Sequence, residues 1–549
     1  MDNARFVLIV FFFFLSVMLF QQWQMDYGPK SESQKTAATA VPQDPDLPDS
    51  LAGSESSPAA SAGSTPATPV ASGRQRIHVE TDVIKMDIDT KGGDIRTLDL
   101  SQYPESKEDP QVPVRLFKDQ DLVFIAQSGF IGDEKNAPTH HSIWQTKSTS
   151  FRLEEGQNEL KVPLTWTDGH GVTVTKTYVL TRGSYDIRLE QQVANEGGQA
   201  WTGRQYLQLQ RKDPGDKNKD QFVRTYTGGV LYTPEDKYKK ISFKDMAGEN
   251  LDKTAKDGWI AMIQHYFVAA WIPKSGEEEA YYTKALADNH FVIGAYGPQM
   301  EIPAGGRLGF TAQLYAGPKL QRVLETTAPG LDLTVDYGAL TLIAKPIFWL
   351  LEQYHTLLNN WGWAIILVTF TLKALFFRLS AASYRSMANM RKLQPKMAEL
   401  KERFGSDRQK LNQAMMEMYR KEKVNPLGGC LPILVQIPVF ISLYWVLIET
   451  VEMRQAPFIG YLTDLSSKDP YFILPLLMGV SMFIQQRLSP PPADPLQAKI
   501  MQFFPVMFTG FFAFFPSGLV LYWVVNNVLS ILQQWYINKT IGAPAPHSA

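Results

Sequence analysis

Residues 361–378 read WGWAIILVTFTLKALFFR, an apolar run that contains one lysine, Lys373, and ends at Arg378. An α-helix of this length approaches the ~20 residues that cross the hydrocarbon core of a bilayer. Similar apolar runs follow at about 431–451, 471–487, 500–515 and 519–536. The C-terminal part of the chain, 359–538, is therefore predicted to be a bundle of five membrane-spanning helices.

The N-terminal part of the chain begins with another apolar run, Phe6–Phe20, which follows Arg5 and precedes Trp23. No small-x-small cleavage site follows it, so we interpret residues 1–25 as an uncleaved signal-anchor helix and a sixth span. Residues 26–75 are mostly Ser, Ala, Pro, Thr, Gly and Asp. Their few bulky apolar side chains cannot offset the entropy of ordering, which predicts a flexible linker.

The region 76–325 has the pattern of a large all-β domain. Val172–Val179 and Tyr185–Val193 alternate in hydrophobicity with a period of two, and Gly-rich turn signals at 91–94 and 195–198 separate such runs. Period-two alternation is typical of strands with one buried face. The fold class predicted here is an all-β sandwich joined to an α-helical polytopic membrane domain.

The distribution of basic residues predicts the orientation of the helices. About a dozen Lys and Arg residues lie in 378–427, whereas 452–470 has only Arg454 and Lys468. The basic loop is therefore expected in the cytoplasm, together with both chain termini, and the β domain on the opposite side. The segment 340–358 is aromatic and too short to span, so we expect an interfacial amphipathic helix opened by Pro346.

Composition excludes several classes of site. The net charge is −1, and the single cysteine, Cys430, allows neither an intramolecular disulfide nor a cysteine zinc cluster. The chain has no HExxH, no GxSxG context and no Walker loop, and its eight histidines show no metal-ligand spacing. We therefore expect no catalytic residue, no metal and no cofactor.

Lys373 is the first candidate for a functional residue. An ammonium group inside a membrane span costs at least ~2.5 kcal/mol, so such residues usually face a cavity or a partner. The alternative is snorkelling, because Lys373 lies only about 7 Å along the helix from the level of Arg378. The sequence offers no deep intramembrane carboxylate as a partner. An acidic residue on a substrate chain would fit.

Polar side chains in the other predicted spans are the second candidate feature. Gln436 lies in one span, and Asn526, Ser530 and Gln533 share a face of the last span because they are spaced i, i+4, i+7. Ordinary hydrogen bonding between helices is the alternative explanation. Together with Lys373, these residues could line a hydrated, positively charged groove.

The predicted cytoplasmic segment 380–424 is the third feature. It has the pattern of a basic helical hairpin with apolar residues at three- and four-residue steps, among them Met387, Met390, Met397, Met415 and Met418. Methionine surfaces adapt to varied apolar partners, although these residues could equally pack the two helices together. The basic faces suit anionic lipid or ribosomal RNA, and we expect no DNA partner.

Three stretches resemble the YidC family of bacterial membrane protein insertases. NPLGGCLPILVQIPVF at 425–440 resembles the start of that family's third transmembrane helix, and FPSGLVLYW at 515–523 resembles the hairpin between its last two helices. GWIAMIQHYF at 258–267 resembles its Gram-negative members. The resemblance covers the whole chain apart from the linker.

The resemblance implies an inner-membrane insertase with a periplasmic β domain and a hydrophilic groove, which works alone or with the Sec translocon and without nucleotide hydrolysis. It places Lys373 at the position of the groove's positive residue, which is Arg in many members, and Thr369, Tyr522 and Trp523 at groove and substrate-contact positions. Nascent membrane proteins with acidic or polar flanks would be the substrates. Ribosomes are also implied as partners, but the tail 539–549 is short and has one lysine, which favours the hairpin as the docking surface.

Two other functions stay open at this point. A membrane-anchored carbohydrate enzyme with a mutarotase-like β domain would require a pocket with convergent His and carboxylate groups. A small-solute transporter would be expected to show an internal repeat and an acidic coupling site, and neither is obvious.

Overall fold

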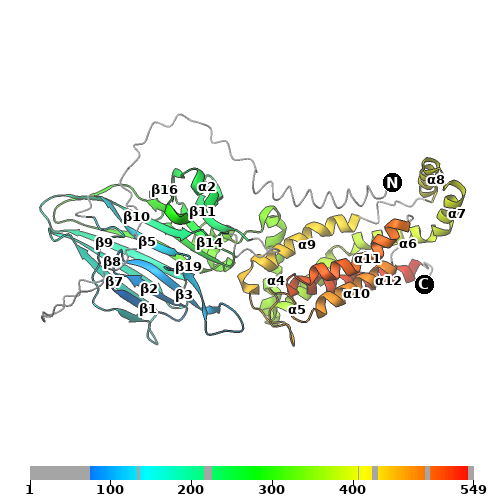
Figure 1. Ribbon diagram of the computed structural model, residues 1–549, viewed down its shortest axis with the longest axis horizontal. Coiled ribbons are helices and arrows are strands. Elements are labelled where there is room, and N and C mark those ends of the chain that lie inside the picture. The colour runs from blue at the N-terminus through cyan, green and yellow to red at the C-terminus, as the bar shows by residue number, and fades with distance from the viewer. Residues whose placement is uncertain are drawn as a thin grey trace. The chain divides into compact units, whose positions relative to one another are not determined.

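The computed structural model describes residues 74–132, 137–215, 225–405, 407–422, 431–488 and 495–541. The chain divides into two compact units, one built from β-strands and one from helices (Figure 1). The predicted β-sandwich with a helical C-terminal region is therefore confirmed. The predicted signal anchor, nearly all of the predicted linker and most of the predicted tail lie outside the described residues.

The β unit consists of two large sheets. Neighbouring strands in both sheets pair antiparallel, apart from the parallel pair β1–β6. The 11-stranded sheet has the order β13 (Asp252–Lys256), β16 (Glu278–Ala285), β17 (His290–Tyr296), β10 (Trp201–Lys212), β5 (Phe124–Gly132), β3 (Asp94–Pro104), β2 (Ile84–Asp89), β1 (Arg76–Glu80) and β6 (Ser150–Arg152), with β18 (Met300–Ile302) on β10 and β4 (Pro113–Phe117) on β3. The 8-stranded sheet has the order β12 (Lys237–Ile241), β11 (Thr227–Thr233), β14 (Trp259–Gln264), β15 (Phe267–Pro273), β19 (Arg307–Pro318), β9 (Asp186–Asn195), β8 (Val172–Thr181) and β7 (Glu159–Thr167).

The sandwich follows from the alternation seen in the sequence. In β9 the side chains of Ile187, Leu189 and Val193 are completely buried, whereas Arg188 between them is exposed. The core between the sheets includes four fully buried tryptophans, Trp144, Trp201, Trp259 and Trp271. Burial of apolar area at ~25 cal/mol per Å² thus stabilises a domain that contains no cysteine to cross-link it.

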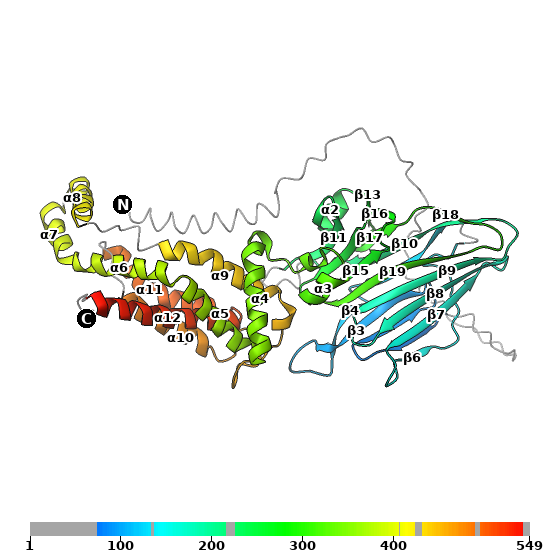
Figure 2. The same cartoon turned by 180° about the vertical axis from the view of Figure 1, so that it is seen from behind.

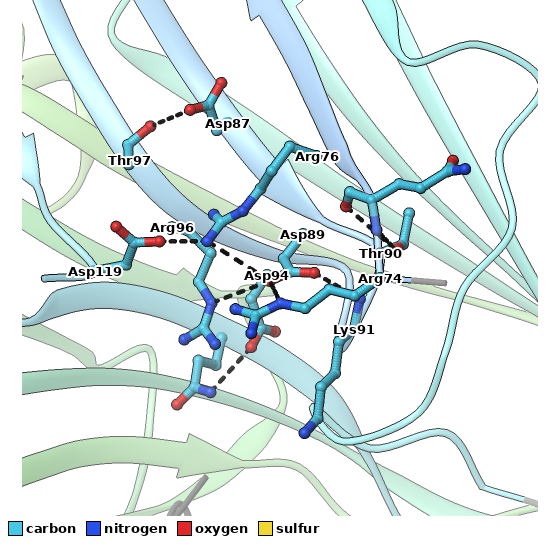
Figure 3. Close-up of polar contacts among 12 residues, drawn as sticks. Arg74, Arg76, Asp87, Asp89, Thr90, Lys91, Asp94, Arg96, Thr97 and Asp119 are labelled. Atoms are coloured by element: carbon cyan, nitrogen blue, oxygen red, sulfur yellow. Dashed lines mark hydrogen bonds and ion pairs between the residues drawn. The ribbon is translucent and has the colours of Figure 1, made fainter. Parts of the chain in front are cut away.

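A cluster of charged residues lies at the start of the β unit, where β1, β2 and β3 meet (Figure 3). The Asp89 carboxylate is fully buried and accepts a hydrogen bond of 2.6 Å from Arg74 Nε. Arg76 and Arg96 approach the same carboxylate oxygen at 3.7 and 3.8 Å, and Arg76 also pairs with Asp119. Opposite charges therefore compensate one another in this cluster, as burial requires.

Lys176 of β8 is completely buried between the sheets. Its Nζ donates hydrogen bonds of 2.9 Å to the Gly92 carbonyl and 2.8 Å to the Ser128 carbonyl, and lies 4.7 Å from the centre of the Trp144 ring. Burial lowers the pKa of Lys176 to about 8, although the Asp94 carboxylate opposes this shift. Burial likewise raises the pKa of Asp94 to about 6. The opposite charges of the two groups therefore attract one another within the core.

The helical unit contains α4 (Thr341–Leu358), α5 (Trp361–Leu375), α6 (Phe377–Lys392), α7 (Gln394–Phe404), α8 (Arg408–Lys421), α9 (Leu431–Glu449), α10 (Ile473–Leu488), α11 (Pro495–Phe512) and α12 (Ser517–Ile541). Figure 2 shows α4 lying across the direction of the bundle helices. Among the described residues no single helix is long and apolar enough to cross a bilayer. Helices α5 and α6 reach that length and composition only when they are taken together, and a bend of 67° separates them.

Pro346 does not open α4, contrary to the prediction. The helix starts at Thr341, directly after the short 3₁₀ turn Gly338–Leu340, so Pro346 lies inside it. The Thr341 hydroxyl donates a 2.6 Å hydrogen bond to the Gly338 carbonyl, which joins the turn to the helix. Pro346 is the sixth residue of the helix, beyond its first turn, so it removes the one i→i−4 hydrogen bond that its missing N–H would have donated.

The turn between α11 and α12 is held by the loop that precedes α10. Ser517 Oγ donates a 2.8 Å hydrogen bond to the Asp464 carbonyl, and its backbone N–H donates to the Ser467 carbonyl at 2.7 Å. The Gly518 N–H donates to the Leu465 carbonyl at 2.9 Å, and an added Cβ at Gly518 would lie only 3.1 Å from that oxygen. Glycine therefore allows the close approach that positions α12.

We predict strong coupling between Asp94 and Lys176 in a double-mutant cycle. Asp94→Asn should lower the free energy of unfolding by about 3–5 kcal/mol, because it leaves the Lys176 ammonium buried without its counter-charge. The double variant Asp94→Asn/Lys176→Met should cost less than the sum of the two single variants. Urea unfolding followed by tryptophan fluorescence measures these values. Additive costs would contradict the buried pair.

The same pair predicts a dependence of stability on pH. The folded pKa of Lys176, about 8, lies below the reference value of 10.5, so between these pH values the unfolded chain binds more protons and stability should rise with pH. For Asp94 the folded pKa is the higher one, so stability should fall as the pH rises from 3.8 to about 6. The rise of stability between about pH 8 and 10.5 should be absent from the Lys176→Met variant. If that variant showed the same rise as wild type, other titratable groups would be its cause.

Candidate functional site

Helices α5, α9 and α12, with the start of α6, line an open cavity of about 400 Å³, a volume that includes the space at its mouth. Its polar lining comes from one face of each helix, with Thr369 and Lys373 on α5, Gln436 on α9, and Tyr522 and Asn526 on α12. Apolar side chains complete the wall: Leu372, Phe376, Leu379, Val435 and Val439. The site thus has a polar stripe in an otherwise apolar bundle.

Lys373 reaches across the cavity to α12. Its Nζ donates a 2.7 Å hydrogen bond to Ser530 Oγ, and that hydroxyl donates in turn to the Asn526 carbonyl at 2.7 Å. Within the described part of the chain, no carboxylate lies within ion-pair distance of Lys373. A hydroxyl and a helix carbonyl stabilise the ammonium group without neutralising it, so its positive charge remains in the cavity.

A second hydrogen bond joins α9 to α12 at the same level. Gln436 Nε2 donates to Asn526 Oδ1 at 2.8 Å, and the buried Tyr522 hydroxyl interacts with the Gln436 side chain. Thr369 is also buried and donates to the Ile365 carbonyl of its own helix at 2.7 Å. The structure therefore brings six of the seven residues of the predicted groove together: Thr369, Lys373, Gln436, Tyr522, Asn526 and Ser530.

Trp523, the seventh residue of that prediction, lies on a different face of α12. Its ring centre is 4.6 Å from that of Phe440 and 5.0 Å from that of Phe512, within an aromatic cluster that continues to Phe508 and Phe515. Consecutive residues of a helix point about 100° apart, so Tyr522 and Trp523 cannot share a cavity wall. Trp523 joins α9, α11 and α12 by packing.

Ser380 of α6 lines the cavity, and the sequence reasoning missed it. Its position beyond Arg378 suggested that it lay outside the apolar span. The bend of 67° between α5 and α6 explains the difference, because after it the first turn of α6 borders the cavity through Leu379 and Ser380. Gln533 of α12, predicted on the same face as Ser530, donates to the Phe377 carbonyl at this bend with a distance of 3.1 Å.

The predicted methionine surface is divided between packing and exposure. The Tyr419 hydroxyl of α8 donates to Met397 Sδ of α7 at 3.5 Å, and Met418 is buried. Met387, Met390 and Met415 are half-buried, whereas Met416 is 64% exposed. An ion pair of 2.5 Å between Lys396 and Glu422 also joins the two ends of this hairpin. Several of the predicted contact residues thus help pack the hairpin itself.

One histidine of the β unit meets a carboxylate, but on the exposed surface, where His78 Nδ1 lies 2.6 Å from Asp87 Oδ1. His140 is buried, and its Nδ1 lies 2.6 Å from the Tyr206 hydroxyl. A hollow of the β unit is lined by Glu277 and Glu279, and no histidine lines it. Among the described residues no group of three His, Cys, Asp or Glu side chains could hold a metal ion. The geometry that a carbohydrate enzyme would require is not found there.

Two family profiles match the sequence, described as "YidC periplasmic domain" over residues 76–350 and "60Kd inner membrane protein" over residues 353–543. A protein of Methylococcus capsulatus named "Membrane protein insertase YidC" is 64% identical over 98% of this chain and 99% of its own length. The chain belongs to the YidC family. Proteins of the same name from Nitrosococcus oceani and Pseudomonas putida are each 49% identical over nearly the full length of both chains.

Membership of the YidC family favours the insertase interpretation over both alternatives raised by the sequence. It also makes this chain an inner-membrane protein with a periplasmic domain, since the two matched profiles describe those parts. The cavity of α5, α9 and α12 lies wholly within the region that matches the inner-membrane profile.

Replacing Lys373 by Met should leave the helical unit as stable as the wild type, or more stable. The variant keeps the length of the side chain and removes a charge whose burial costs at least ~2.5 kcal/mol. Thermal unfolding of the purified protein in detergent measures this, with Ser530→Ala as the comparison. A loss of stability larger than that caused by Ser530→Ala would indicate that Lys373 has a structural role.

Proposed function

We propose that this protein inserts membrane proteins into the inner membrane, and that the cavity of α5, α9 and α12 receives the polar flank of a substrate helix. The observation that carries the proposal is the Lys373 ammonium, which has a hydroxyl partner and, in the described residues, no counter-charge. A carboxylate on a substrate flank supplies that counter-charge. Tyr522, Asn526 and Gln436 provide further hydrogen-bonding groups in the same cavity.

The energetics of insertion support this mechanism. A polar flank that crosses hydrocarbon loses its hydrogen bonds to water, which costs several kcal/mol for each unsatisfied group. A polar cavity shortens that crossing, and Lys373 attracts an acidic flank during it. Burial of the apolar part of the substrate helix supplies the driving force at ~25 cal/mol per Å². The proposal therefore needs no enzymatic step and no nucleotide hydrolysis.

The proposed topology has six spans, with both termini in the cytoplasm. The signal anchor 1–25 and five helices within 359–538 cross the membrane, and the linker 26–75 leads to the periplasmic domain 76–325. Helix α4 lies in the interface, which is supported by its exposed Leu342, Trp349 and Leu357 and its buried Ile347 and Leu351. The basic hairpin 380–424 and the tail 539–549 are then cytoplasmic.

The proposed partners beyond the substrate are the Sec translocon, the ribosome and anionic lipids. The hairpin of α7 and α8 is the candidate surface for the ribosome and for lipid headgroups, because its basic side chains include Lys396, Lys401 and Arg420. Met416 of the same hairpin is an exposed apolar side chain. We propose the β domain as a scaffold and partner-docking surface.

Insertion of a small single-span substrate with an acidic flank into proteoliposomes tests the function. Lys373→Ala and Lys373→Glu should both reduce insertion by about tenfold or more, since loss of one buried charge interaction exceeds ~1.4 kcal/mol. A substrate with a basic flank should regain insertion with Lys373→Glu. Trp523→Phe is the matched control, because it changes α12 outside the cavity and should insert normally.

Normal insertion by both Lys373 variants would contradict the electrostatic role and leave hydration and shape as the contribution of the cavity. Loss of insertion without rescue by the basic-flank substrate would show that Lys373 maintains the cavity and does not attract the substrate. Failure of the wild type to insert any substrate would contradict the proposed function itself.

A further inference from the structure

The β unit contains a second cavity, which we call the Glu279 hollow. It encloses about 490 Å³ including its open mouth, and it lies where strands β10, β16 and β18 of the large sheet approach β19 of the small sheet. Strand β19 pairs with β9 from Arg307 to Tyr315, but with β15 only from Ala312 onward. The part of β19 before Ala312 therefore borders the hollow.

Glu279 is the buried acidic group of this hollow. Glu279 is 6% exposed, and its carboxylate has no hydrogen bond or ion pair in the described residues. Burial raises the pKa of Glu279 to about 7, and the neighbouring Glu277 adds to this shift. A carboxylate that is largely removed from water and has no partner is costly, and such a group beside a cavity marks a candidate binding site.

The other charges of the hollow do not neutralise Glu279. Lys274 is the cation that lines the hollow, and its Nζ pairs with Glu277 at 2.8 Å. The charges of Lys274 and Glu277 therefore cancel, and one negative charge remains on Glu279 when it is ionised. A ligand that fits this balance carries a single positive charge.

The uncharged lining gives the second requirement for the ligand. Gln205 uses its Nε2 to donate to Gln191, at 2.7 Å, so its side-chain oxygen remains as an acceptor, and Thr311 also lines the hollow. Met300 and Phe310 form part of an apolar wall. Three oxygen acceptors match the three N–H donors of an ammonium group, and the apolar wall suits the alkyl chain attached to it.

We propose that the Glu279 hollow binds a primary alkylammonium group, with the Glu279 carboxylate as its counter-charge and Gln205 and Thr311 as further acceptors. A lysine side chain of a polypeptide and a free small amine share this chemistry. The proposal is independent of the insertase activity, because it concerns a site in the β unit that uses none of the residues of the helical cavity.

The test is an NMR titration of the full-length protein in detergent with n-butylammonium, at a pH of about 8.5 where Glu279 is ionised and the amine is protonated. Wild type should bind with a saturable, single-site isotherm, whereas n-butanol, the uncharged analogue, should not bind. Glu279→Gln should weaken binding by at least about tenfold. Glu278→Gln is the matched control, because Glu278 is the exposed neighbour on the same strand and its variant should bind like wild type.

A variant that fills the Glu279 hollow tests whether the ligand binds there, without a change of charge. An added Cβ at Gly309, which lines the hollow, would meet no atom within 4 Å, so Gly309→Leu should fold normally and fill the space. It should abolish binding, and unchanged thermal unfolding would show that the fold is intact.

The short peptide acetyl-Ala-Lys-Ala-amide separates the two sources of the ligand. Binding of the peptide at least as tightly as n-butylammonium identifies a polypeptide lysine, and binding of n-butylammonium alone identifies a small amine. The proposal is wrong if neither probe binds wild type, or if Glu279→Gln or Gly309→Leu binds as wild type does.

Discussion

The helical unit depends on how a single ammonium group is accommodated among apolar helices. Lys373 cannot leave its helix, and in hydrocarbon it must find polar partners. Ser530 and Asn526 of α12 provide them, and Gln436 of α9 extends the same set of hydrogen bonds. Lys373, Gln436 and Asn526 all line the cavity, so the positive charge is held within it.

The β unit also contains a lysine away from solvent, Lys176, but its charge is compensated differently. Lys176 is as deeply buried as any side chain of the protein, but it has two backbone carbonyls, an aromatic ring and the Asp94 carboxylate around it. Its charge is thus compensated within the fold, whereas that of Lys373 is left for a partner. Glu279 resembles Lys373 in this respect, since neither charged group has a counter-charge in the described residues. Uncompensated charge marks the places where a ligand adds stability.

Much of the architecture could be predicted because it depends on local periodicity. The period-two alternation of Tyr185–Val193 became β9, and the apolar runs after residue 360 correspond to α5 and α9 to α12. The shared face of Asn526, Ser530 and Gln533 follows from helical spacing alone. The role of Pro346 in opening α4 was predicted wrongly, because the preceding 3₁₀ turn and the Thr341–Gly338 hydrogen bond have no periodic signal.

The sequence by itself determined the two kinds of domain, the positive charge in an apolar run and the polar face opposite it, since each depends on the order of residues along one element. Only the tertiary structure decided that Ser380 enters the cavity and Trp523 does not, because those outcomes depend on a bend between two helices and on the rotation of α12 against its neighbours. The Glu279 hollow also had no signal in the sequence. Its residues come from separate strands of two sheets, and only the packing of those sheets brings a carboxylate, an amide and a hydroxyl around one space.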